Sequence, residues 1–104
     1  MMSPTDLDAL IDEITVDAYG DEEQEAGFLV AFEEALVRGE PAQLARAPVE
    51  VVKVDCGPGL RTGLRATVRA GGSKHEVSLS DLVFHDESEV APIAYAYRRW
   101  LGWR

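Results

Sequence analysis

Several residue types and segments that indicate particular classes of protein are scarce or missing in this chain of 104 residues. Its single cysteine, Cys56, excludes an internal disulfide and leaves no thiolate cluster for a zinc site. Apolar runs such as Phe28–Phe32 are far shorter than the ~20 residues that a membrane-spanning helix needs. The first residues, Met1–Asp6, contain no basic stretch, so a secretory signal is not expected. We therefore expect a cytoplasmic protein with no membrane segment.

Positive charge is scarce in the first part of the chain. The whole sequence has 10 Lys and Arg against 19 Asp and Glu, a formal net charge of -9. Residues 1–40 hold 12 acidic side chains and one basic one, Arg38, whereas residues 41–104 hold 7 acidic and 9 basic ones. Because a protein that binds nucleic-acid phosphates needs a basic surface, nucleic acid is a disfavoured partner. The charge instead directs attention to residues 1–40.

Two helices are predicted within this acidic part. Ser3 is a suitable N-cap, Pro4 suits the first helical position and Asp6 completes a capping box, so a helix is expected to begin here. This first helix is expected to run to about Glu13. A second helix is predicted from about residue 22 to 38, with Asp21 as its N-cap. Gly39 and Pro41 are expected to end it. The buried faces follow from apolar residues at helical spacing, which are Leu7, Leu10, Ile11 and Ile14, then Phe28, Leu29, Phe32, Ala35 and Leu36.

The rest of the chain is expected to form strands followed by one helix. Residues 40–48 contain two prolines and are interpreted as a connector. The alternation of apolar and polar residues shifts by one position between Val51 and Val52, which predicts a β-bulge. Gly71-Gly72-Ser73 predicts a tight hairpin. Pro92 must lie in the first turn of a final helix over 88–101 that Gly102 ends. Period-two alternation or short apolar runs predict three or four strands, over 49–54, 64–70, 74–79 and 82–84.

This order of elements indicates the α+β class. We expect N-terminal helices, a small antiparallel barrel-like (SH3-like) sheet and a C-terminal helix, because so few short strands need helices to cover them. A single domain over residues 1–104 is expected. It would contain an acidic helical part (1–40), a β part (48–84) and a C-terminal helix (88–101).

Five carboxylates gather within nine residues around the predicted turn before the second helix: Asp17, Asp21, Glu22, Glu23 and Glu25. Ca²⁺ prefers six to eight oxygen ligands, which carboxylates and turn carbonyls supply together. The EF-hand spacing of acids before a glycine is absent, however. The same residues also suit the start of a helix, where the dipole stabilises anions. Both interpretations, a cation site and a solvated helix start, are open at this point.

Two further sets of residues have weaker functional interpretations. His75 and His85 have no second ligand at zinc spacing, so we expect a packed His75 and an exposed His85. No nucleophile motif accompanies Cys56, and no enzyme is expected. Arg61, Arg65 and Arg69 share strand parity on the expected outer face of the sheet. Because no aromatic residue lies between Val37 and Phe84, stacking on nucleic-acid bases is disfavoured. We expect these arginines to bind the acidic N-terminal helices of the same chain or of a partner.

Two segments of the sequence are distinctive: VDAYG-x-EEQ, which begins at Val16, and AYRRWLG, which begins at Ala96. They occur together with Gly27-Phe28, Phe32–Leu36, Pro48–Val52, Leu82–Phe84 and Ala94–Gly102. Together these segments resemble a family of small bacterial calcium-binding proteins, typified by a cyanobacterial calcium-sequestering protein. The resemblance covers about residues 14–102.

The resemblance implies a non-enzymatic protein that sequesters Ca²⁺ with surface acids. Asp17, Asp21, Glu22 and Glu23 match the family's acidic motif, and Glu25 lies beside them. The sequence departs from the type member in its near-neutral to basic β half, where extra acids would strengthen cation binding. The alternative is a protein-interaction module that forms a homodimer or binds a protein partner through its acidic and basic faces, without a metal.

Overall fold

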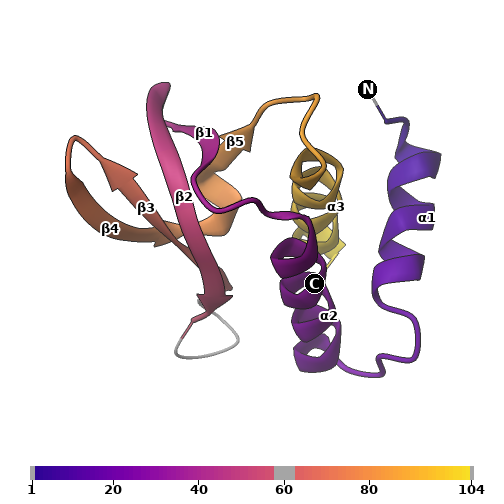
Figure 1. Cartoon of the computed structure of the whole chain (residues 1–104). Helices are drawn as coiled ribbons and strands as arrows, with labels where there is room; N and C mark the ends of the chain where they lie inside the picture. Colours follow the sequence, from indigo (N-terminus) through magenta and orange to yellow (C-terminus); the bar gives the residue numbers. More distant parts are fainter. Residues whose placement is uncertain (1, 58–62, 104) are drawn as a thin grey trace.

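Two helices pack against one face of a curved, five-stranded antiparallel sheet, and the N-terminal helix packs on these two helices (Figure 1). The structure is a computed structural model that describes residues 2–57 and 63–103. The helices are α1 (Pro4–Ile14), α2 (Asp21–Ala35) and α3 (Val90–Trp103). The strands are β1 (Glu40–Leu44), β2 (Ala47–Cys56), β3 (Leu64–Ala70), β4 (Ser73–Ser78) and β5 (Leu82–Phe84), and the 3-10 helix η2 (Leu79–Asp81) joins the last two.

The α+β class and the order of its parts are confirmed. The strands run in the order β4-β3-β2-β1-β5, so β4 and β5 are the two edges. The described residues show no pairing between these edge strands, and the sheet curls without closing into a barrel. No helix in the described part of the chain is long and apolar enough to cross a membrane.

The two N-terminal helices begin in different ways. In α1 the predicted capping box is confirmed: Asp6 N–H donates to Ser3 Oγ, and Ser3 N–H donates to Asp6 Oδ2, both at 3.2 Å. The prediction that Asp21 caps α2 was wrong, because Gly20 is the N-cap and makes no side-chain cap hydrogen bond. Asp21 is the first helical residue instead. Helix α2 also ends at Ala35, earlier than the predicted residue 38, because Leu36 already has extended backbone angles.

The interpretation of residues 40–48 as a connector was wrong. Residues Glu40–Leu44 form β1, which pairs with β2 through a tight turn at Ala45 and Arg46, with φ of 50° and 70°. Turns with two positive φ angles usually contain asparagine or glycine, so this hairpin carried no sequence signal. The prolines fit because each lies where a neighbouring strand is absent: β5 pairs only with residues 42–44, and β3 pairs with β2 from Glu50 on.

The remaining predictions, for the strands and for the last helix, are confirmed in most details. The register of β2 against β3 shifts between Val51 and Lys53, as expected for the bulge. Gly71 and Gly72 have φ of 57° and 87° and form the β3–β4 hairpin. Pro92 lies in the first turn of α3, where the Ser88 hydroxyl accepts a hydrogen bond from Ala91 N–H at 3.2 Å. Helix α3 continues to Trp103, past the predicted end at Gly102.

The core joins α2 and α3 to the inner face of the sheet. The rings of Phe28 and Tyr97 lie 5.4 Å apart between centroids, and Phe28 lies equally close to Trp100. Polar ends of these aromatic side chains are satisfied: Leu64 N–H donates to the Tyr97 hydroxyl at 2.9 Å, and Trp100 Nε1–H donates to Gln24 Oε1 at 2.7 Å. Tyr97 and Trp100 are therefore part of the core.

Helix α3 also holds α1 and the end of the sheet. Arg99 Nε donates to Asp8 Oδ1 of α1 at 2.6 Å, and this hydrogen bond raises the pKa of Arg99. Arg98 donates to the carbonyl oxygens of Ser80 and Leu82 and thereby ties α3 to η2 and β5. The hydroxyl of Tyr95 donates to Asp86 Oδ1 at 2.6 Å, which together with partial desolvation raises the Tyr95 pKa above its usual value.

Candidate metal site

The acidic segment predicted from the sequence lies on the turn between α1 and α2 and on the first turns of α2. Thr15 ends α1 by donating its hydroxyl to the Ile11 carbonyl at 2.7 Å. Asp17 follows with φ of 62°, a left-handed conformation that aspartate tolerates better than most residues. Its side chain is exposed and forms no hydrogen bond or ion pair with any described residue. The turn therefore presents one carboxylate to solvent.

Three more acids occupy the first turn of α2: Asp21, Glu22 and Glu23. Glu23 has a local structural role, because its Oε2 accepts a hydrogen bond from the backbone N–H of Tyr19 at 3.0 Å. Asp21 and Glu22 are exposed and have no hydrogen-bond or ion-pair partner within residues 2–57 and 63–103. The positive end of the helix dipole stabilises all three carboxylates. Their position thus fits the start of a helix and also leaves two charged groups open to solvent.

Glu25 occupies a different environment from the other four acids. Only 6% of it is exposed, whereas Asp17, Asp21, Glu22 and Glu23 are all exposed. One helical turn apart, Glu22 and Glu25 line the same hollow of about 330 Å³ between α2 and the end of β2. Leu29, Cys56 and Leu64 complete most of its wall. The fold thus brings Glu22 and Glu25 to one face of α2.

The five carboxylates do not form a ready-made metal centre. Across the described residues, no group of three or more His, Cys, Asp or Glu side chains is placed to hold one metal ion. Glu23 reaches back to the turn, Glu25 is buried against the sheet, and Asp17 lies on the preceding loop. A cation bound here would need side-chain rotations to gather its ligands, and backbone carbonyls or water would have to complete its shell.

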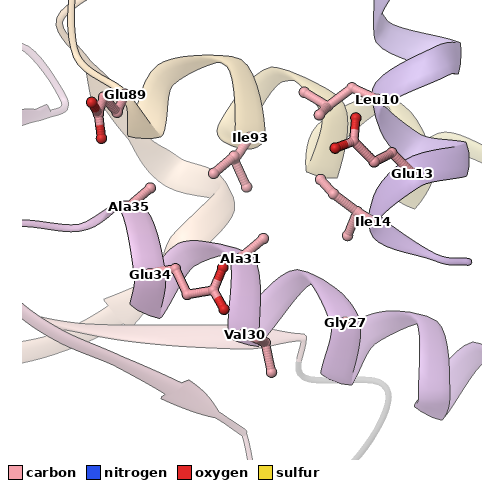
Figure 2. A pocket seen from close by; sticks show the side chains of 10 residues that line it. All are labelled: Leu10, Glu13, Ile14, Gly27, Val30, Ala31, Glu34, Ala35, Glu89 and Ile93. Carbon is pink, nitrogen blue, oxygen red and sulfur yellow. The ribbon is translucent and has the colours of Figure 1, made fainter.

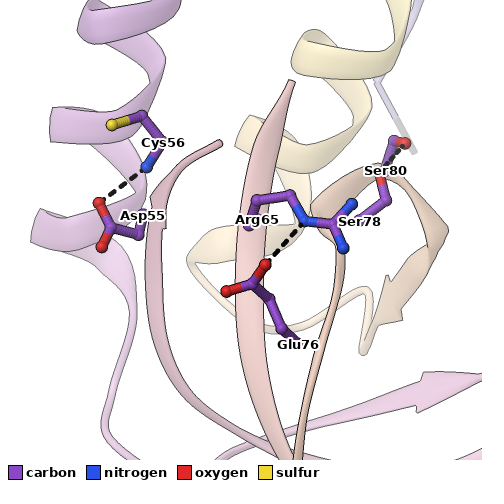
Figure 3. A network of polar contacts seen from close by, with 6 residues as sticks. All are labelled: Asp55, Cys56, Arg65, Glu76, Ser78 and Ser80. Atoms are coloured by element: carbon purple, nitrogen blue, oxygen red, sulfur yellow. Dashed lines mark hydrogen bonds and ion pairs between the residues drawn. The ribbon is translucent and has the colours of Figure 1, made fainter. Parts of the chain in front are cut away.

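The arginines on the sheet bind acids of the sheet itself. Arg65 Nε contacts Glu76 Oε1 of β4 at 3.4 Å (Figure 3), and Arg69 contacts Glu50 of β2 at 3.9 Å. The expectation that they bind the acidic helices of the same chain was therefore wrong, because the helices cover the opposite face (Figure 1). Arg61 lies outside the described residues.

Among the described residues, the two histidines and the cysteine belong to no metal-binding group. His75 pairs with the buried Val68 and so shares its inner face, as the parity predicted. It is nevertheless exposed, because the β3–β4 hairpin extends beyond the helices (Figure 1), so the prediction of a packed His75 was wrong. His85 is exposed as predicted. Cys56 is an exposed free thiol, and its backbone N–H donates to Asp55 Oδ1 at 2.8 Å.

A second acidic feature was not recognised from the sequence. Glu13 of α1, Glu34 of α2 and Glu89 just before α3 stand around a larger hollow of about 510 Å³ (Figure 2). Their sequence positions are far apart, and each belongs to a charged stretch typical of an exposed helix face or loop. Only the packing of three helices places them around one hollow. No local pattern in the sequence would have indicated it.

Comparison with solved structures gives a clear match of the whole fold. The structure aligns with the crystal structure of Anabaena CcbP with a TM-score of 0.75 and 19% sequence identity, covering 97% of this chain and 93% of that one. It aligns equally well with a calcium-binding protein in its calcium-binding form, with a TM-score of 0.74, 18% identity and coverage of 97% and 96%. No protein-family model matches the sequence, and no curated protein matches it. The chain therefore shares the fold of these two proteins, which confirms at the level of fold the resemblance carried by its acidic and C-terminal segments.

Proposed function

We propose that this single-domain protein is a non-enzymatic, cytoplasmic calcium-binding protein. One observation carries the proposal: five carboxylates lie around the turn and start of α2 in a fold shared with a protein solved in its calcium-binding form. The proposed ligands are Asp17, Asp21, Glu22, Glu23 and Glu25.

The geometry supports a weak site. Asp17, Asp21 and Glu22 are the most accessible ligands, since each is exposed and makes no polar contact with a described side chain. Glu23 must give up its hydrogen bond with Tyr19 to contribute, and Glu25 must turn from its buried position. Ca²⁺ affinity depends on the charge and rigidity of the ligand set, so a set that must rearrange should bind with a dissociation constant of about 10⁻⁴–10⁻³ M.

Calorimetric titration with Ca²⁺ at physiological salt tests this proposal. The double variant Asp21→Asn, Glu22→Gln removes two charges without changing side-chain size and should weaken binding about tenfold or more, since ligand charge sets affinity. A matched control is Asp12→Asn with Glu33→Gln. It makes the same two chemical changes at exposed positions on α1 and at the far end of α2.

Two results would contradict the proposal. One is wild-type protein that shows neither heat of binding nor thermal stabilisation at millimolar Ca²⁺. The other is equal weakening in the test and control variants, which would mean that Ca²⁺ responds to the overall charge of -9 and not to the start of α2.

The alternative function, an interaction module without a metal, also has one supporting observation. Within the described residues, the helices leave the outer face of the sheet uncovered (Figure 1). Arg69, on that face, is exposed. A second copy or a protein partner would then place an acidic surface against it. Light scattering at low and high salt tests this idea: a charge-driven dimer must form at low salt and dissociate at high salt, and a monomer at low salt contradicts it.

A further inference from the structure

The hollow between the three helices combines an apolar floor with an acidic rim. It measures about 510 Å³, within the range of small-molecule sites. Apolar side chains of Leu10, Ile14 and Ile93 point into it from α1 and α3, and Ala31 faces them from α2 (Figure 2). We call this feature the three-helix groove. It is lined by Leu10, Glu13, Ile14, Gly27, Val30, Ala31, Glu34, Ala35, Glu89 and Ile93.

Helices α1 and α2 pack closely where Ile14 meets Gly27 in the wall of the groove. A Cβ atom built on Gly27 would lie 2.7 Å from the backbone oxygen of Ile14, so only glycine allows α1 to approach α2 at this point. Beyond this contact α1 leans on α3, where Arg99 holds Asp8 at 2.6 Å. Helix α1 is therefore fixed at two places, and the groove lies between its last turn, α2 and the start of α3 (Figure 2).

The charge around the groove has one sign and is not neutralised. Glu13, Glu34 and Glu89 come from three different segments, and none forms an ion pair with a described residue. No side chain that lines the groove is basic. At the same time, these carboxylates do not form a group able to hold one metal ion within the described chain. They are suited to a ligand that carries several separated positive charges.

From this combination we propose that the three-helix groove binds an aliphatic diamine or polyamine cation. The alkyl spacer lies on the apolar floor formed by Leu10, Ile14 and Ile93. Its ammonium groups lie at the rim and form charge-assisted hydrogen bonds with Glu13, Glu34 and Glu89. This site is separate from the proposed Ca²⁺ ligands, so either proposal can fail without the other.

A series of α,ω-diamines provides a direct test with the intact protein. Every member carries two charges, while the spacer grows from about three to about ten methylene groups. Each methylene that enters an apolar site should strengthen binding by up to about fourfold, until the diamine spans the rim carboxylates. Binding that depends only on the negative surface gains nothing from a longer spacer. NMR titration at physiological salt, with Ca²⁺ present at saturation, measures the affinity and locates the shifted residues.

The chain offers a matched pair of variants for the charges. Glu13→Gln with Glu34→Gln removes two rim carboxylates from α1 and α2. The control variant, Asp12→Asn with Glu33→Gln, changes the neighbouring acids instead. Both lie outside the groove on the same two helices. The rim variant should weaken diamine binding about 3- to 25-fold, whereas the control should leave it nearly unchanged.

The apolar floor is tested separately. Ala31→Leu places a larger side chain in the groove at a position where leucine is a good helix former. It should abolish the dependence of affinity on spacer length while retaining every charge. The exposed Glu→Gln variants provide the test if this variant does not fold.

Three outcomes would overturn the proposal. The first is an affinity that does not rise with spacer length in the wild-type protein. The second is equal weakening of binding in the rim and control variants. The third is occupation of the groove by something other than a diamine. It would be seen as NMR shifts of Glu13, Ala31 and Ile93 when Ca²⁺ alone is added or when the protein concentration is raised. Shifts caused by a basic helical peptide, with none caused by diamines, would have the same meaning.

Discussion

The outer face of the sheet balances its charges locally, whereas the helical layer leaves many of its charges unbalanced. On the sheet, Arg65 pairs with Glu76 and Arg69 with Glu50 across neighbouring strands. In the helical layer Asp8 pairs with Arg99, but Glu13 and Glu34 form no ion pair with a described residue. The two regions differ because antiparallel register places opposite charges side by side, while residues 1–40 contain one basic side chain. Cation binding is therefore expected of the helical layer.

The largest expected effect comes from the core that both regions share. Phe28→Ala removes a fully buried ring that packs against Tyr97 and Trp100, and it should lower the free energy of unfolding by about 3–5 kcal/mol. Urea unfolding followed by far-ultraviolet circular dichroism and tryptophan fluorescence should show one shared transition. Val30→Ala on the same helix, where Val30 is 52% exposed, is the control and should have a much smaller effect. Two separate transitions would mean that helices and sheet are independent units.

A second prediction concerns the hydrogen bond that links α3 to β3. Tyr97→Phe leaves the buried N–H of Leu64 without its acceptor and should cost about 1–3 kcal/mol of stability. Tyr95→Phe is the same chemical change on the same helix, but its hydroxyl bonds the exposed Asp86, so the cost should stay within about 0.5 kcal/mol. Urea unfolding measures both, and hydrogen exchange of the Leu64 amide should accelerate only in the first variant. Equal effects would contradict the assignment of this bond as the link between the two regions.

The smallest expected changes in stability should have opposite signs in the helical layer and on the outer face of the sheet. Glu33→Gln removes a carboxylate from the last turn of α2, where the helix dipole disfavours it, and should stabilise the protein by about 0.3–1 kcal/mol. Glu76→Gln removes the partner of Arg65, and because that pair is largely exposed it should destabilise the protein by only about 0.2–1 kcal/mol. Thermal unfolding at low salt measures both changes. High salt should reduce both changes in stability. Two changes of the same sign would contradict the difference between a sheet face with balanced charges and a helical layer with unbalanced ones.

Sequence patterns predicted the elements whose signals are local. The capping box from Ser3 to Asp6, the Gly71-Gly72 hairpin and the parity change at Val51 all depend on neighbouring residues, and the structure contains each of them. Strand β1 was missed because its turn uses Ala45 and Arg46 in left-handed conformations, which only the pairing with β2 and β5 stabilises. A strand whose turn lacks the usual residues is visible only through its partners.

The candidate site divides in the same way. The acidic segment from Asp17 to Glu25 is continuous in sequence, so it was recognised directly. That Glu25 is buried while Glu22 lines the same hollow depends on how α2 packs against β2, which the pattern of charges does not show. The groove bounded by Glu13, Glu34 and Glu89 joins residues distant in sequence, so no motif predicts it.

The sequence by itself determined the class of the fold, the negative charge of its first part and the place where five carboxylates gather. These are properties of composition and local spacing, and they hold however the elements pack. Tertiary structure alone decided which charges are neutralised, which carboxylates share a hollow and where α1 leaves a groove beside α2. The reason is physical: ion pairs, burial and grooves depend on distances between residues far apart in the chain, and those distances exist only after the helices have packed on the sheet.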